Sequence, residues 1–281
     1  MFNLLKKRDA IARKNIKFLM PELSDAEVNE IADMSLKHYV KSVRQLLALY
    51  MKALPPFHHI FKNPFSKIET CIDTRDYHLA KTNIFMAAHY SSWHMLSPYA
   101  ISKLTGHNHD MEIMYVVSKM FLRSDRLSIY TIARAIQDNL YNSHDGKTII
   151  KFIPPKRIFR TLIRSSNMVT GCIIFSDQFP VYAKDTKKRI PVKFFGKDVL
   201  FSLGAEQIAR KMGASVYYLQ QNFSNDYRRI SISAIKLTTA NEDLPYGYIT
   251  QQYATELEKQ IRTDPTQWLW QHKRFKDDIV Y

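Results

Sequence analysis

The amino-acid sequence predicts an α/β fold, a single domain in which a central, largely parallel mixed sheet is flanked by helices. From residue 83 onward, short apolar runs of strand length alternate with segments of helical periodicity, which is typical of parallel strands joined by helices. The first 56 residues carry helical periodicity alone, which predicts N-terminal helices packed on that layer. A hydrophobic content of 46% supplies enough apolar material for a packed core.

Two helices are predicted in the N-terminal portion. Residues 4–19 place apolar side chains on one side and basic side chains on the other. This pattern suits either a helix lying on an anionic bilayer or a helix with a solvated basic face, and the sequence leaves both alternatives open. Ser24 and Glu27 have the spacing of a capping box, which predicts the start of a second helix that ends at Pro55-Pro56.

The rest of the chain divides into predicted strands and helices. Apolar runs predict strands at 84–88, 112–117, 148–153, 169–176 and 215–220, and strict alternation predicts a later one at 227–237. Helical periodicity covers 92–104, 119–141, 155–165, 201–212 and 247–262. Because no repeat or Pro/Gly-rich linker divides the chain, we expect one domain over 1–281, with a helical portion at 1–56 and an α/β portion at 57–281.

Charge is the strongest compositional signal. The formal net charge of +15 favours a polyanionic partner, either nucleic acid, an anionic lipid surface or an acidic carrier protein. The sequence contains no zinc-finger cysteine pattern, RNA-recognition signature or glycine-rich nucleotide loop, so no nucleic-acid partner is expected. It also lacks an apolar run of membrane-spanning length, so any membrane contact is expected to be peripheral.

Two polar residues follow predicted strands at the edge of the sheet where sites form in α/β folds. His89 follows the strand at 84–88, and Asp177 follows the strand at 169–176. An imidazole there can take a proton from an attacking hydroxyl at neutral pH, although the ring could equally be satisfied by backbone groups. Asp177 could orient a polar group or stabilise a turn.

Other segments admit a functional and a structural interpretation. The pair Phe194-Phe195 before Gly196 could line an apolar channel or pack in the core. Residues 265–276 place two tryptophans beside cationic side chains, which suits a membrane interface or simple packing on the domain. The paired histidines at 58–59 and 107–109 lack helical spacing and acidic or thiol neighbours, so no metal site is expected.

Taken in order, these motifs resemble those of the lipid A biosynthesis acyltransferases, over about residues 8–276. Residues 18–24 resemble the family's F-P-E-x-S entry. His89 matches the histidine of its His-x4-Asp/Glu motif, and Asp177-Gln178 matches its D-Q strand end. Phe194-Phe195-Gly196 resembles its F-F-G run, and residues 267–276 resemble its closing Q-W-x-W-x-H-R-R-F-K.

The resemblance implies a glycerolipid-acyltransferase-like fold and an acyl transfer reaction. A fatty acyl chain would pass from acyl carrier protein or coenzyme A to a hydroxyl of a lipid A precursor or related lipid, at the cytoplasmic face of the inner membrane. The thioester would be a co-substrate, with no other cofactor and no metal. The implied catalytic residues are His89, His94 and Asp177, and the implied substrate-binding residues are Gln178, Phe194, Phe195, Gly196, Lys273 and Arg274.

Three departures from the family pattern leave an alternative open, a catalytically altered member that binds lipid. Position 94 is a histidine where the family has Asp or Glu, so it supplies no negative charge to an imidazolium. The family's Arg before a Gly is missing from residues 142–146. The sequence starts near the entry motif, so the family's upstream anchor helix is not expected.

Overall fold

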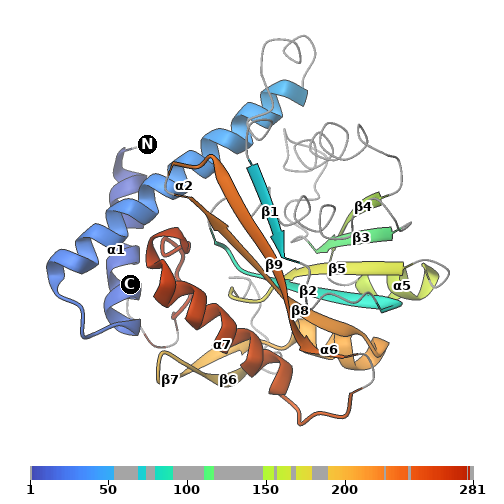
Figure 1. Ribbon diagram of the computed structural model, residues 1–281. Helices are drawn as coiled ribbons and strands as arrows, with labels where there is room; N and C mark the ends of the chain where they lie inside the picture. The colour runs from blue at the N-terminus through green and yellow to red at the C-terminus, as the bar shows by residue number, and fades with distance from the viewer. Residues whose placement is uncertain are drawn as a thin grey trace.

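The computed structural model describes residues 2–53, 69–73, 80–90, 111–116, 148–154, 157–165, 169–178, 189–224, 226–239, 242–276 and 278. Seven strands form one sheet in the order β1-β9-β8-β2-β5-β3-β4 (Figure 1). Their bounds are β1 Glu69–Asp73, β2 Thr82–Ala87, β3 Met111–Val116, β4 Thr148–Ile153, β5 Val169–Phe175, β8 Ser215–Phe223 and β9 Arg229–Thr238. Only the β8–β9 pair is antiparallel, so the predicted α/β fold with a largely parallel mixed sheet is confirmed.

A separate antiparallel hairpin and one edge strand were not expected from the sequence. The hairpin consists of β6 (Arg189–Phe194) and β7 (Lys197–Ser202), and the edge strand is β1. Apolar runs revealed β2, β5 and β8 because those strands are buried on both faces. The hairpin alternates buried and solvent-facing residues over only six positions per strand, which gives a weak signal.

Two long helices open the chain, α1 (Phe2–Leu19) and α2 (Asp25–Ala53). The predicted capping box is present. Glu27 Oε2 accepts hydrogen bonds from the backbone N–H of Ser24 at 2.8 Å and from its hydroxyl at 2.7 Å, and Ser24 Oγ accepts the N–H of Glu27 at 3.3 Å. These bonds satisfy donors that the first turn leaves unpaired, and they fix where α2 begins.

The apolar side of α1 faces the protein core. Ala12 and Ile16 are fully buried and Leu19 is nearly so, whereas Lys6, Lys7, Lys14 and Lys17 are exposed. Of the two alternatives for this helix, the described side chains match the solvated basic face. On the second half of α2, Val43 and Leu47 are 42% and 57% exposed, whereas the polar side chains of Ser42 and Gln45 are buried.

Among the described residues, three further helices belong to the α/β layer: α5 (Ile158–Arg164), α6 (Gly204–Met212) and α7 (Tyr248–Thr263). The predicted start of α6 at residue 201 is wrong, because residues 201 and 202 belong to β7. The predicted helices at 92–104 and 119–141 lie outside the described residues, as do the proline pair at 55–56, the paired histidines and residues 142–146.

The hairpin turns at Phe195-Gly196, where both residues have positive φ angles of 51° and 73°. Two positive φ values in a two-residue loop match the primed turns that suit the twist of a hairpin, and Gly adopts them most readily. Phe195 is held in this conformation by its own contacts. Its N–H donates to Glu258 Oε2 at 2.5 Å, and the guanidinium of Arg262 lies 4.4 Å from its ring centroid.

Replacing Gly196 by alanine is expected to lower the free energy of unfolding by about 1 kcal/mol, because a Cβ makes the left-handed conformation unfavourable. The added Cβ meets no atom within 4 Å, so the cost is conformational alone. Urea unfolding at equilibrium measures it. The control is Gly204→Ala, in the first turn of α6, where the Cβ lies at an ordinary 3.6 Å from Ser202 Oγ. An equal loss in both variants would contradict this explanation.

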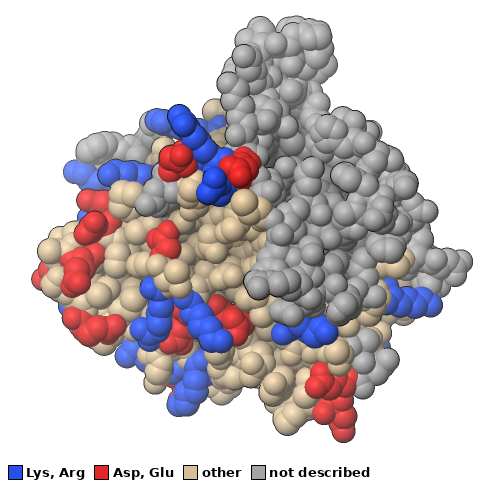
Figure 2. Space-filling view, viewed as in Figure 1, with Lys and Arg blue, Asp and Glu red and all other residues tan. Residues whose placement is uncertain are grey.

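Basic and acidic side chains are mixed over the face of the molecule seen in Figure 2, rather than separated into large areas of one sign. Within the described part of the chain, no helix is both long enough and apolar enough to cross a bilayer.

Candidate active site

The site lies at the carboxyl end of the central strands. β2 pairs in parallel with β5, and the last residues of the two strands, Ala87 and Phe175, are opposite each other. Two residues beyond each strand come His89 and Asp177. The shared register therefore brings these two side chains to the same edge of the sheet, where the carboxyl ends of parallel strands form binding crevices.

His89 and Asp177 are joined by two hydrogen bonds. The ring Nδ1 of His89 lies 2.6 Å from Asp177 Oδ1, and the backbone N–H of His89 donates to Oδ2 at 3.0 Å. The Asp177 side chain is fully buried and that of His89 is 11% exposed. The ring of His89 also packs against Phe175, with 4.8 Å between centroids. The imidazole is thus held at both its ring and its backbone.

The surroundings of Asp177 keep its carboxyl group ionised. Burial by itself raises the pKa of this group, but the electrostatic interactions with His89 and Arg274 and the hydrogen bonds from His89 outweigh burial and hold the pKa well below the usual aspartate value. An ionised carboxylate only accepts hydrogen bonds, so Nδ1 of His89 must carry the proton between them. In the neutral ring, Nε2 is then the nitrogen with the basic lone pair.

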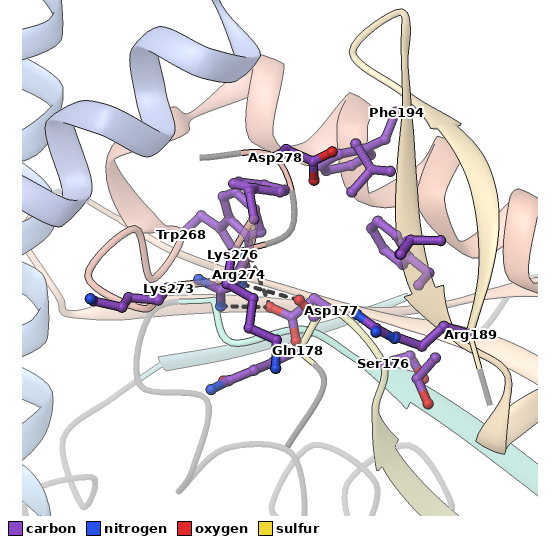
Figure 3. Close-up of a pocket in the computed structure, with 15 residues that line it drawn as sticks. Ser176, Asp177, Gln178, Arg189, Phe194, Trp268, Lys273, Arg274, Lys276 and Asp278 are labelled. Atoms are coloured by element: carbon purple, nitrogen blue, oxygen red, sulfur yellow. Dashed lines mark hydrogen bonds and ion pairs between the residues drawn. The ribbon is translucent and has the colours of Figure 1, made fainter. Parts of the chain in front are cut away.

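The C-terminal segment, residues 265–276, supplies the remaining partners of Asp177 (Figure 3). Trp268 Nε1 donates to Oδ2 at 3.0 Å, and Arg274 Nη2 donates to the same oxygen at 2.9 Å. Arg274 Nε also donates to the backbone carbonyl of Asp177 at 3.1 Å, and its guanidinium lies 4.4 Å from the Trp268 ring centroid. The carboxylate therefore cannot rotate away from His89 without breaking several bonds.

The backbone at His89 and the two N-terminal helices hold this segment in place. The backbone N–H of Leu269 donates to the carbonyl of His89 at 2.9 Å. Asn15 of α1 donates through its side-chain amide to the carbonyls of Trp270 at 2.7 Å and His272 at 2.8 Å. Ser35 of α2 donates to the carbonyl of Trp268 at 2.8 Å. The N-terminal helices thus position residues that contact Asp177.

The structure brings most of the sequence-predicted site residues together. Asp177, Gln178, Phe194, Lys273 and Arg274 line one pocket between the β6–β7 hairpin and the C-terminal segment. Phe195 and Gly196 do not line this pocket, because they form the turn of the hairpin. His94 lies outside the described residues, so its predicted role stays a prediction.

The contact of Trp268 with Asp177 was not predicted from the sequence. The tryptophans of 265–276 suited either a membrane interface or packing, and the structure supports packing, since Trp268 and Trp270 are 1% and 0% exposed. Their rings meet edge to face at 4.6 Å, and Phe194 adds a third ring 6.1 Å from Trp268. Their proximity to a strand-end acid depends on tertiary structure, for which a local motif carries no signal.

Clusters suited to a metal ion are absent from the described part of the chain, where no three His, Cys, Asp or Glu side chains converge. The arrangement that is present, an imidazole oriented by an ionised carboxylate, is chemically suited to removing a proton from a hydroxyl.

Acid should destabilise the fold through His272, which lies near this site. Burial, followed by the charges of Arg274 and His89, lowers its pKa to about 3. A histidine in the unfolded chain has a pKa of about 6.5. Between these two pKa values only the unfolded state binds the proton. The stability that His272 contributes is therefore fully present above the unfolded-state pKa, and it falls as the pH decreases below that value. We expect a loss of about 2 kcal/mol from pH 7 to about pH 5, absent in His272→Gln. Urea titrations at both pH values measure it, and equal pH dependence in the two proteins would contradict it.

Comparison with protein families identifies a match. The family model described as bacterial lipid A biosynthesis acyltransferase matches residues 137–277. This stretch contains Asp177, Trp268 and Arg274, whereas His89 precedes it. The curated proteins yield no match. With half of its length matched, and with the fold that the resemblance implied, the chain belongs to the bacterial lipid A biosynthesis acyltransferase family.

Proposed function

We propose that this protein transfers a fatty acyl chain from an acyl thioester to a hydroxyl of a lipid A precursor or related lipid. Family membership supplies the general class, acyl transfer of the lipid A type. The hydrogen-bonded pair of His89 and Asp177 is the single observation that carries the mechanism. An imidazole paired with a carboxylate at the carboxyl edge of the sheet supports a role for His89 as the base.

In this mechanism Nε2 of His89 accepts the proton of the acceptor hydroxyl as the oxygen attacks the thioester carbonyl. A tetrahedral intermediate forms and collapses, the carbon–sulfur bond breaks, and the protonated imidazole returns its proton to the departing thiolate. Products are the acylated lipid and the free thiol of acyl carrier protein or coenzyme A. The acyl group never becomes attached to the protein, and the thioester is the only co-substrate required.

Asp177 supports the base and takes no proton itself. Its carboxylate fixes the Nδ1–H tautomer and stabilises the imidazolium that forms during attack. In this proposal Asp177 provides the negative charge that the family motif places at position 94, where this chain has a histidine. A histidine at position 94 is therefore compatible with catalysis.

The reaction is proposed to occur peripherally at the cytoplasmic face of the inner membrane, where an acyl thioester and a lipid acceptor can meet. The net charge of +15 supports contact with anionic lipid and with an acidic carrier. Purified protein, incubated with labelled acyl thioester and a bacterial lipid extract, should yield a labelled lipid. Comparing acyl carrier protein with coenzyme A as the carrier identifies the donor. Absence of transfer from both donors, while the protein still binds the lipid extract, would favour the lipid-binding alternative.

A further inference from the structure

The second half of α2 turns apolar side chains outward and polar side chains inward. Ser42 and Gln45 are 2% and 9% exposed, whereas Val43 and Leu47 are 42% and 57% exposed. A surface helix normally has the opposite arrangement, because the burial of its apolar face holds it on the core. The reversed arrangement indicates that the outer face of this helix meets a further apolar surface.

The outward apolar side chains form one continuous stripe. Side chains three or four positions apart lie on the same face of a helix. Four apolar residues of α2 have this spacing, and each is partly or largely exposed: Leu36, Val40, Val43 and Leu47. With 3.6 residues per turn, this stripe lies on the side of the helix opposite the buried Ser35, His38 and Ser42. A single exposed leucine is ordinary, but a row of this length is a contact surface.

The charge beside the stripe is positive. From Met34 to its end at Ala53, the helix contains four lysine and arginine residues and no acid. Lys37 and Arg44 are exposed, and they lie about two turns apart on the same border of the stripe. The preceding acid, Asp33, is paired with Arg13 at 2.9 Å. The partner that fits is therefore apolar where it meets the stripe and anionic where it meets the cations.

We propose that the outward stripe of α2 lies on the surface of a bilayer that contains anionic phospholipid. Val43 and Leu47 enter the boundary between headgroups and acyl chains, and Lys37 and Arg44 lie against lipid phosphates. A second copy of the chain fits less well, because it would bring the same cations of both copies to one interface. The inference rests on the proposed function, in which the acceptor is a lipid, and it names the surface by which the protein reaches that lipid.

The inward face of the same helix contacts the segment that holds the proposed catalytic pair. The hydroxyl of Ser35 donates to the carbonyl of Trp268 at 2.8 Å, and the indole of Trp268 donates to Asp177 at 3.0 Å. A helix with its side chains is roughly 10 Å across. A bilayer on the outer face of α2 would therefore be separated from the C-terminal segment by about the width of one helix. This arrangement would hold the proposed site near the lipid surface.

Co-sedimentation of the intact protein with vesicles tests the stripe. One set of vesicles contains phosphatidylethanolamine and phosphatidylglycerol in equal parts, and the other contains phosphatidylcholine alone. The apolar variant is Val43→Gln/Leu47→Gln, in which glutamine keeps a good helix former at each position. Its control is Ile163→Gln/Tyr246→Gln, which changes two side chains that are 61% and 63% exposed elsewhere on the molecule. Thermal unfolding checks that each variant is folded.

A second pair of variants tests the charge. Lys37→Gln/Arg44→Gln removes the cations that border the stripe. Arg160→Gln/Lys236→Gln is the control, since it removes the same charges from exposed positions on α5 and β9. The charge variant should bind the anionic vesicles about tenfold more weakly, and this difference should shrink at high salt. Equal weakening in the control would show that only the overall charge of the protein matters, which would overturn the assignment to α2.

The wild-type protein should bind the anionic vesicles, and the apolar variant should bind them about tenfold or more weakly, because two apolar side chains no longer leave water. The control for the apolar variant should bind like the wild type. A wild-type protein that does not bind vesicles would overturn the proposal, as would an apolar variant with unchanged binding. Sedimentation velocity tests the other occupant. A dimer that the apolar substitutions dissociate, without any vesicle binding, would assign the stripe to a second copy instead.

Acyl transfer measured with two forms of the acceptor separates this inference from the proposed function. With the acceptor dispersed in detergent, the apolar variant should transfer at the wild-type rate, because its catalytic residues are intact. With the acceptor in anionic vesicles, its rate should fall together with its binding. Absence of transfer in both forms would refute the proposed function, whereas the vesicle-binding comparison decides the membrane surface by itself.

Discussion

Replacing His89 by asparagine is expected to reduce the rate of acyl transfer by at least about 10³-fold, because the base that removes the hydroxyl proton is lost. The asparagine amide can still donate a hydrogen bond to the Asp177 carboxylate, which also keeps its bonds from Trp268 and Arg274. The fold should therefore survive. A labelled-thioester assay measures the rate, and thermal unfolding measures the stability.

The histidine-matched control is His38→Asn. His38 is buried on α2, where its ring contacts Tyr227 and Thr266 rather than the proposed catalytic pair of His89 and Asp177. This variant should retain most of the transfer rate. A His89→Asn protein that is folded and transfers acyl groups at the wild-type rate would refute the proposed mechanism.

Replacing Asp177 by asparagine is expected to have two separate effects. The rate should fall by up to about 10⁴-fold, because the amide no longer fixes the Nδ1–H tautomer or stabilises the imidazolium. Stability should fall by about 3–5 kcal/mol, because the guanidinium of Arg274, whose side chain is 3% exposed, loses its charge partner. The rate effect should appear in kcat, with little change in KM, since Asp177 acts through His89. Steady-state kinetics and urea unfolding measure the two effects.

A second variant separates these effects if the single variant fails to fold. Asp177→Asn/Arg274→Met removes both buried charges, so it should be more stable than Asp177→Asn alone. Its kcat should stay low, because the carboxylate that orients His89 is still missing. A double variant with wild-type kcat would show that Asp177 has a structural role only.

The fold was largely predictable because buried parallel strands leave a strong local signal. β2, β5 and β8 are buried along most of their length and each contains a run of apolar residues, since both faces of each strand are covered. The hairpin was harder to predict, because it is short and alternates in burial. Its contribution to the pocket lining was also hidden, because the sequence motif does not distinguish Phe194 from Phe195. The structure separates them, placing Phe194 at the pocket and Phe195 in the turn.

The candidate site was predictable residue by residue but not as an arrangement. His89 and Asp177 each stood out as a polar residue after an apolar strand. Their contact spans 88 residues and depends on the alignment of β2 with β5, which neither segment encodes alone. The hydrogen bond from Trp268 to Asp177 and the position of Arg189 in the pocket lining were not predicted, because each depends on which distant segment packs beside it. Long-range register is the information that local periodicity lacks.

The bonds from Asn15 to the carbonyls of Trp270 and His272 join residues 255 and 257 positions apart in the chain. A contact of such range forms late, because a large loop must close before the contact contributes any stability. During synthesis, α1 and α2 emerge first and have no C-terminal segment to hold. Arg274 can reach Asp177 only after residue 274 has been synthesised, long after the strands that carry His89 and Asp177. The contacts from Trp268 and Arg274 that hold the Asp177 carboxylate should therefore be among the last to form.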